Sequence, residues 1–151
     1  MSETTQHLID SDAITRLVHR LGVALDEGRF EDLRSIFTAD ASASTPGGTA
    51  SGIDAVVAQA ARNHTPETVT QHAISGVLID VDGSGSSATV RANLVVTFAP
   101  ASAARGPAPA PPATYTLGET YRFTAASTPS GWRLSSVETT PLWSLGTPPP
   151  R

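Results

Sequence analysis

The sequence predicts a single α+β domain, with helices in the first part of the chain and a curved antiparallel sheet in the rest. Apolar residues in the first 64 positions recur mainly with the period of amphipathic helices. From Thr68 onward the pattern changes to β-rich runs separated by turn residues. The length of 151 residues is that of one ordinary domain. We therefore expect helices gathered on one side of a sheet.

The first part of the chain contains three predicted helices and one short strand. Capping residues at positions 10–12 precede a stretch of apolar residues at helical spacing, and Gly28 follows closely enough to end this helix. A second, short helix is expected at 30–37 and a strand at 41–45. Ser51 begins a capping pattern for a third helix. The apolar stripe of the first helix comprises Ile14, Leu17, Val18, Leu21 and Leu25.

Four longer strands are predicted in the second part. Glycine within a strand often marks a bulge, so Gly76 predicts an irregularity in the first of them. The second alternates most clearly, with Arg91, Asn93 and Thr97 on one face and small or apolar residues on the other. The four predicted strands cover residues 68–81, 87–98, 114–125 and 131–143.

Residues 99–113 are almost entirely alanine and proline. Because proline cannot donate to a sheet, this segment is predicted to be a loop, serving as a flap, a lid or tolerated low complexity. We expect residues 1–9 to be flexible, 10–146 to form the domain and 147–151 to be a disordered tail.

Composition excludes several classes of function. The chain has no cysteine and its basic residues are all arginine, so thiolate and Schiff-base chemistry are absent. The net charge of -4 argues against a nucleic-acid partner. No apolar run is long enough for a membrane span, and we expect a cytoplasmic protein. No cluster has metal-ligand spacing and no glycine-rich loop suits a nucleotide, so no metal or cofactor is expected.

Asp26 is the first candidate for chemistry. Stepping back by four residues gives Gly22 and then Val18, so Asp26 borders the apolar stripe of the first helix and is predicted to point inward. Buried carboxylates need donors or a cationic partner, and such groups cluster in functional sites. The alternative is that Asp26 only satisfies backbone donors near the end of its helix.

His72 is the second candidate, because it lies in a strand otherwise made of small and apolar residues. An imidazole can take and return a proton near neutral pH, and a neighbouring carboxylate would fix its tautomer. A lone strand histidine is more often structural, but an inward aspartate beside it favours catalysis. The remaining histidines, His7, His19 and His64, are expected to be solvated.

The order of these features resembles the SnoaL-like branch of the nuclear transport factor 2-like superfamily, which also holds scytalone dehydratase, ketosteroid isomerase and polyketide cyclases. Gly131 begins the last matching segment, and the matches together extend from about residue 10 to 146. The resemblance implies a cone-shaped curved sheet around a long helix, an apolar pocket and often a homodimer through the outer face of the sheet. The matching segments are residues 25–41, 51–56, 70–83 and 131–146.

In the scytalone dehydratase-like members, an aspartate orients a histidine, and the histidine moves the proton during loss of water. The resemblance implies these roles for Asp26 and His72. Leu25 stands where those enzymes have an activating tyrosine, and no histidine follows His72 to supply their second imidazole. Asn93, with Arg91 and Thr97 on the same face, is a candidate to hydrogen-bond a substrate oxygen instead.

Other candidates are weaker. Glu119 and Tyr121 share a face of their strand, Glu138 lies on the last strand, and Phe30 is expected in the core or pocket wall. Tyrosine in a strand can polarise a carbonyl or simply pack. Both tryptophans are expected to pack.

The sequence thus favours a cofactor-independent acid–base enzyme of secondary metabolism, a cyclase, dehydratase or isomerase acting on an apolar oxygenated intermediate such as a polyketide. His72 would be the base, oriented by Asp26. One alternative is a non-catalytic binding or assembly module of the same fold. Another is an isomerase or epoxide-opening enzyme that uses Glu119 or Glu138.

Overall fold

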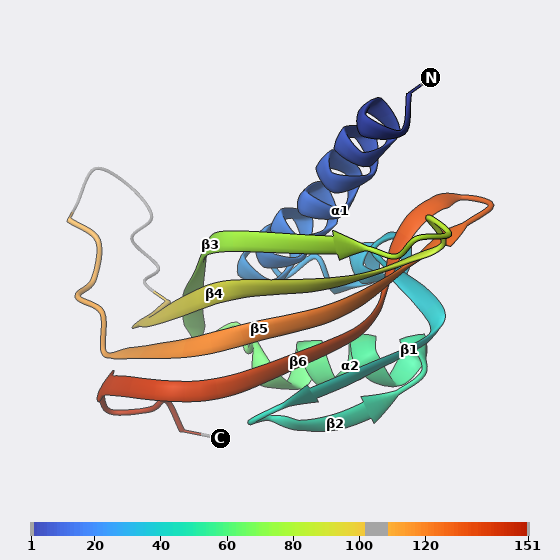
Figure 1. The fold of residues 1–151 in the computed structure, drawn as a ribbon. Coiled ribbons are helices and arrows are strands. Elements are labelled where there is room, and N and C mark those ends of the chain that lie inside the picture. Colours follow the sequence, from blue (N-terminus) through green and yellow to red (C-terminus); the bar gives the residue numbers. More distant parts are fainter. Residues whose placement is uncertain (1, 102–108, 151) are drawn as a thin grey trace.

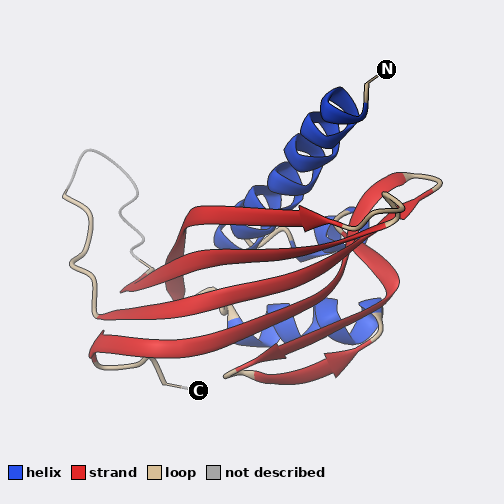
Figure 2. Ribbon diagram, viewed as in Figure 1, coloured by secondary structure: helices blue, strands red, loops and turns tan. Residues whose placement is uncertain are grey.

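The fold is a curved six-stranded sheet whose helices all lie against one face (Figures 1 and 2). A computed structural model of the chain describes residues 2–101 and 109–150. The strand order is β2-β1-β6-β5-β4-β3, so β2 and β3 are the edges of an unclosed sheet. The predicted α+β class, with a curved sheet against a long N-terminal helix, is confirmed.

Helix α1 (Glu3–Asp26) begins earlier than its sequence pattern predicts. Ser2 is the N-cap and its hydroxyl accepts from the Thr5 amide, so residues 3–9 are helical. Asp10 is not a cap: it lies inside the helix and is buried, where it accepts a hydrogen bond of 3.0 Å from the indole N–H of Trp132. This bond joins the helix to the last strand. It also gives the buried indole N–H an acceptor, without which its burial would be costly.

The predicted second helix is a 3₁₀ helix, η1 (Phe30–Ser35), which leads into β1 (Phe37–Thr45). A short strand that the sequence did not reveal, β2 (Gly48–Ser51), follows. The third predicted helix is α2 (Ile53–Asn63). Its N-cap is Gly52 without a side-chain cap, so the expected cap by Ser51 is wrong.

The four long strands are β3 (Thr68–Val81), β4 (Ser87–Pro100), β5 (Tyr115–Thr128) and β6 (Gly131–Gly146), and neighbouring pairs are antiparallel. The predicted irregularity in β3 is present as a register shift after Ser75, and Gly76 has a φ of 61°. Strand β1 pairs with β6 in parallel, which the expectation of a purely antiparallel sheet did not include.

The core fills the space between the helices and the concave face of the sheet. In Figure 1 the helices lie behind the sheet, so its outer, convex face is toward the reader. Alternate residues of β4, from Ala88 to Val96, are buried in the same core cluster as the apolar stripe of α1. At the β1–β2 end of the same face, α2 is held to β1 and β2 by the buried Gln59, whose amide donates to Thr45 and to the Gly48 carbonyl.

Residues 102–108, the middle of the alanine- and proline-rich segment predicted to be a loop, flap or lid, lie outside the described residues, as do positions 1 and 151. Within the described chain, no helix combines the length and apolar character needed to cross a membrane.

Candidate active site

Asp26 is the last residue of α1, and the helix brings it directly against β3. Four residues earlier, Gly22 lies so close to β3 that a Cβ there would be 3.1 Å from the Ile74 side chain and 3.4 Å from the His72 Cβ. The absence of a side chain at this position therefore lets the helix approach the strand. The predicted inward direction of Asp26 follows from this close packing.

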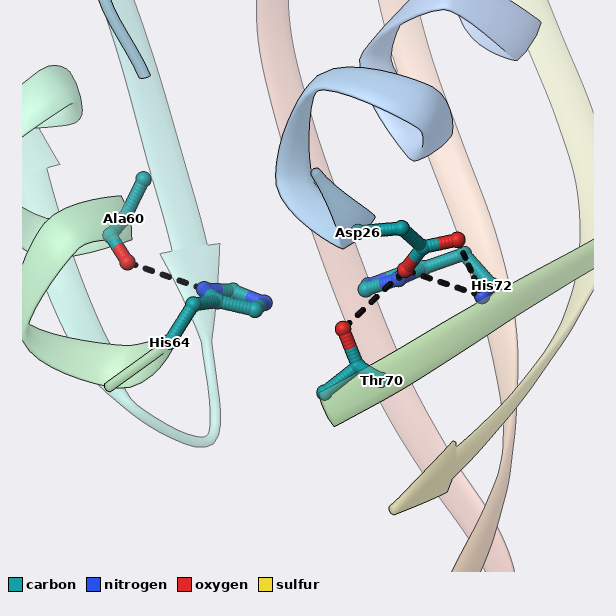
Figure 3. Close-up of polar contacts among 5 residues, drawn as sticks. All are labelled: Asp26, Ala60, His64, Thr70 and His72. Atoms are coloured by element: carbon teal, nitrogen blue, oxygen red, sulfur yellow. Dashed lines mark hydrogen bonds and ion pairs between the residues drawn. The ribbon is translucent and has the colours of Figure 1, made fainter. Parts of the chain in front are cut away.

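The Asp26 carboxylate accepts hydrogen bonds from three groups on β3 (Figure 3). Its Oδ1 lies 2.5 Å from the His72 Nδ1 and 3.0 Å from the Thr70 hydroxyl, and its Oδ2 lies 2.9 Å from the His72 amide nitrogen. Because β3 is an edge strand, no neighbouring strand offers an acceptor to that amide on this side. The Asp26 carboxylate is the acceptor instead. The contact predicted between Asp26 and His72 is thus present.

The Asp26 carboxylate determines which nitrogen of the neutral His72 ring carries the hydrogen. Burial alone would raise the pKa of Asp26, but the hydrogen bonds from His72 and Thr70 and the attraction of the imidazolium lower it overall. Asp26 is therefore a carboxylate that accepts the Nδ1–H of His72, which leaves the lone pair on Nε2. The His72 side chain is 5% exposed and that of Asp26 is 22% exposed. The imidazole is accordingly shielded and held in one tautomer.

His64, which the sequence pattern suggested was solvated, is half-buried beside His72. The two ring centroids are 5.6 Å apart, and the His64 Nδ1 lies 2.9 Å from the Ala60 carbonyl oxygen. Phe30 also lies beside His64, with ring centroids 6.1 Å apart. The expectation for His64 was wrong because its position after α2 gives no periodic signal, and only the packing of α2 brings it to the site.

Glu119 and Tyr121 lie on the concave face, opposite Leu94 and Ala92 of β4, and both are buried. Burial raises the pKa of the Glu119 carboxyl, and the nearby Thr139 hydroxyl and the charge of His72 offset only part of this. Its Oε1 has no hydrogen-bond partner among the described residues. Burial likewise raises the pKa of the Tyr121 hydroxyl, and the charges of Glu119 and Asp26 raise it further. These groups therefore face the same region as the Asp26–His72 pair.

The polar residues of β4 are placed on the other side of the sheet. Arg91, Asn93 and Thr97 alternate with the buried residues of β4 and belong to its outer face. Arg91 and Asn93 are linked to each other there, at 3.3 Å. Glu138 is also exposed. None of these four side chains shares the concave face with His72, which corrects the expectation that Asn93 and its neighbours could meet a substrate in that space.

No group of three or more histidine, aspartate and glutamate side chains with metal-binding geometry occurs in residues 2–101 and 109–150. The two imidazoles next to Asp26 supply only two nitrogen ligands, each with its Nδ1 already engaged. The chemistry that this donor set offers is proton transfer.

Comparison with known protein families matches residues 6–138 to the profile of the SnoaL-like domain. This match covers most of the chain, including Asp26, His72 and Glu119. A search of curated proteins finds no match.

Solved structures share the fold at low identity. A candidate scytalone dehydratase from Novosphingobium aromaticivorans has a TM-score of 0.78 and 23% identity, over 97% of this chain and 93% of that one. A protein of the nuclear transport factor 2-like class with a cystatin-like fold, from the same species, has a TM-score of 0.71 and 24% identity, over 92% and 86%. The LinA-type3 hexachlorocyclohexane dehydrochlorinase from Novosphingobium barchaimii has a TM-score of 0.74 and 17% identity, over 98% and 100%. At these identities the likeness shows the fold alone.

Proposed function

The chain belongs to the SnoaL-like domain family, and starting from this membership we propose that it is an acid–base enzyme of the lyase or isomerase type. It acts on a small, apolar, oxygenated molecule such as a polyketide intermediate, as a dehydratase, cyclase or isomerase. The observation that carries the proposal is the 2.5 Å contact between the Asp26 Oδ1 and the His72 Nδ1. A carboxylate in this position fixes the basic nitrogen of the imidazole and stabilises the imidazolium that forms.

In the proposed reaction, the His72 Nε2 removes a proton from a substrate carbon next to a carbonyl group. The C–H bond breaks and an N–H bond forms, and the electron pair moves onto the carbonyl oxygen. Collapse of this enolate expels a hydroxide from the neighbouring carbon. His72 then returns its proton to the hydroxide, so water leaves and the enzyme regains its starting state. Throughout, Asp26 remains the acceptor for the Nδ1–H.

The buried donors on β5 support the same chemistry. An enolate oxygen is stabilised by donors that are fixed before the reaction begins. The raised pKa of the Tyr121 hydroxyl keeps it protonated; burial also raises the pKa of the Glu119 carboxyl, which is a donor whenever it is protonated. Apolar surroundings strengthen both interactions, because competing water is reduced.

The test uses a β-hydroxytetralone probe, which aromatises to a naphthol on losing water and is followed by absorbance. Proton exchange at the carbon next to the carbonyl is followed in parallel by NMR in heavy water. We expect His72→Gln to lower the rate on the order of 10²–10⁴-fold. Asp26→Asn is expected to lower the rate as well. The matched control is His19→Gln, because His19 is an exposed histidine of α1.

A His72→Gln variant that is folded and turns the probe over at the wild-type rate would contradict the proposal. Binding of the probe without exchange or dehydration would instead favour a non-catalytic binding module.

A second candidate is an isomerase that uses Glu119 as its base. The specific observation is that the Glu119 carboxyl is buried with an oxygen that has no partner among the described residues, near His72. A carboxylate in apolar surroundings is a stronger base than one in water. In this case Glu119→Gln would abolish proton exchange in the probe and His72→Gln would leave it largely intact.

A further inference from the structure

Near Asp26, the His64 ring is a neighbour of two other rings, and the three rings come from three separate elements. Phe30 comes from η1, His64 from the end of α2, and His72 from β3. The planes of Phe30 and His64 are inclined at 45°, and those of His64 and His72 at 34°. The ring shared by both pairs is therefore a second imidazole, and its centroid lies 5.6 Å from that of the imidazole proposed as the base.

Hydrogen bonding defines the tautomer of His64. The Ala60 carbonyl oxygen can only accept, so the His64 Nδ1 must carry a hydrogen and the lone pair of the neutral ring lies on Nε2. Figure 3 shows Nδ1 turned toward Ala60 and the opposite edge of the ring turned toward His72. The free basic nitrogen of His64 is thus on the side of the site.

The surroundings of His64 keep it neutral when His72 is charged. Burial lowers the pKa of His64, the Ala60 hydrogen bond and the Asp26 carboxylate raise it, and a charge on His72 lowers it, with a net lowering. The titratable groups that face His72 from the other elements are Asp26 at the end of α1 and the buried Glu119 on β5. Two adjacent imidazolium ions would repel each other, so a proton held by His72 beside the Asp26 carboxylate disfavours a second proton on His64.

A protonated His72 has two N–H donors, and Asp26 accepts only one of them. A donor left without a partner in a shielded site is costly. We propose that His64 is a second proton-transfer residue of this site, whose Nε2 accepts the proton that His72 has gained, first as a hydrogen bond and then by transfer. In the transfer, the N–H bond at His72 breaks as one forms at His64. The inference rests on the proposed role of His72 as the base.

The relay has a consequence for the class of reaction. One proton can be removed from the substrate at one atom and delivered at another, because the two Nε2 atoms belong to neighbouring rings. This geometry suits a hydrogen shift or an elimination in which the leaving oxygen is distant from the acidic C–H bond.

The experiment on the wild-type protein is ¹⁵N-detected NMR of the four imidazole rings as a function of pH. We expect the His64 Nε2 to be unprotonated at neutral pH and its signal to move at the midpoint at which His72 titrates. A separate step at lower pH then reports its own protonation. A His64 Nε2 signal that does not change while His72 titrates, or that shows a bound hydrogen at neutral pH, would overturn the inference.

Two variants separate this role from packing. His64→Phe keeps a ring between Phe30 and His72 but removes both nitrogens, and His64→Gln keeps a polar group. If His64 only fills space, the His64→Phe variant retains the turnover of the tetralone probe. If His64 transfers protons, the variant loses about 10-fold or more in kcat with little change in KM. In His72→Phe, the titration midpoint of His64 moves to higher pH because the neighbouring charge is gone.

The outcomes also distinguish this inference from the function on which it rests. Loss of turnover in His72→Gln together with normal turnover in His64→Phe refutes the relay and retains the proposed base. Normal turnover in His72→Gln refutes both.

Discussion

At the scale of single residues, the Asp26 carboxylate contacts both the backbone and the side chain of His72. It accepts from the backbone amide of His72, which an edge strand leaves unpaired, and from the ring of the same residue. The backbone and the imidazole are therefore fixed by one group, and the Thr70 hydroxyl limits the rotation of that group. Cations, rather than carboxylates, are favoured near a helix C-terminus, so the placement of Asp26 depends on these donors.

Glu119 provides a prediction about stability and pH. Its folded-state pKa is raised above the ordinary value of 4.5, so its effect on stability is fully favourable below about pH 4.5 and is lost as the pH rises through the folded-state pKa. Glu119→Gln cannot ionise. We expect the unfolding free energy of the wild type to fall relative to that of Glu119→Gln over this interval, as measured by urea unfolding at several pH values.

The control for this measurement is Glu138→Gln, because Glu138 is exposed on β6. Its unfolding free energy should follow that of the wild type across the same pH range. If the difference between Glu119→Gln and the wild type is constant from pH 4 to pH 8, or opposite in sign to that expected, burial does not govern the ionisation of Glu119.

At the scale of elements, the site depends on how closely α1 approaches β3. Gly22 is a point of close approach, one helical turn before Asp26. A methyl group there would already contact the flexible end of the Ile74 side chain and the Cβ of His72, and a larger side chain would need additional space between α1 and β3. The separation of α1 and β3 thus controls the distance between the carboxylate and the imidazole.

We therefore predict that Gly22→Leu destabilises the fold by about 1–3 kcal/mol and separates Asp26 from His72. Urea unfolding measures the first effect, and the NMR signal of the His72 Nδ1–H measures the second. Val23→Leu is the matched control, because its neighbouring position on α1 is 47% exposed. A Gly22→Leu protein with wild-type stability and an intact Nδ1–H signal would show that the helix can move without cost.

The sequence predicted those parts of the elements and site that local periodicity specifies. Helical spacing placed Asp26 beside the apolar stripe of α1, and strand alternation placed Asn93 opposite the buried face of β4. The alternation along β4 therefore already indicated that Asn93 points away from the core. His64 and the parallel pairing of β1 with β6 could not be predicted in this way. Both depend on contacts between segments distant in sequence, which leave no periodic pattern in either segment.

At the scale of the whole molecule, the two faces of the sheet differ. The helices cover the concave face, and the outer face has no helix on it in the described chain (Figure 1). Near the end of β6, Trp143 lies over Gly118 and is still 50% exposed, and Leu145 is 72% exposed. The apolar area at these two residues lies opposite the face that carries Asp26 and His72.

The homodimer implied by the sequence resemblance is predicted to form through this outer face. The expected result is a mass of about twice 15.6 kDa in light scattering after size-exclusion chromatography. Leu145→Arg should raise the dissociation constant on the order of tenfold or more, since it places a charge among desolvated apolar groups. Leu8→Arg is the control, because Leu8 is 65% exposed on the first turns of α1.

Each outcome of this experiment has a distinct meaning for the assembly. A wild-type protein that remains at the monomer mass at micromolar concentration contradicts the dimer. A dimer that survives Leu145→Arg but dissociates with Leu8→Arg moves the interface from the sheet to the free end of α1. Because the concave face is opposite the outer face, probe turnover by the Leu145→Arg monomer should remain near that of the wild type if the site is complete within one chain.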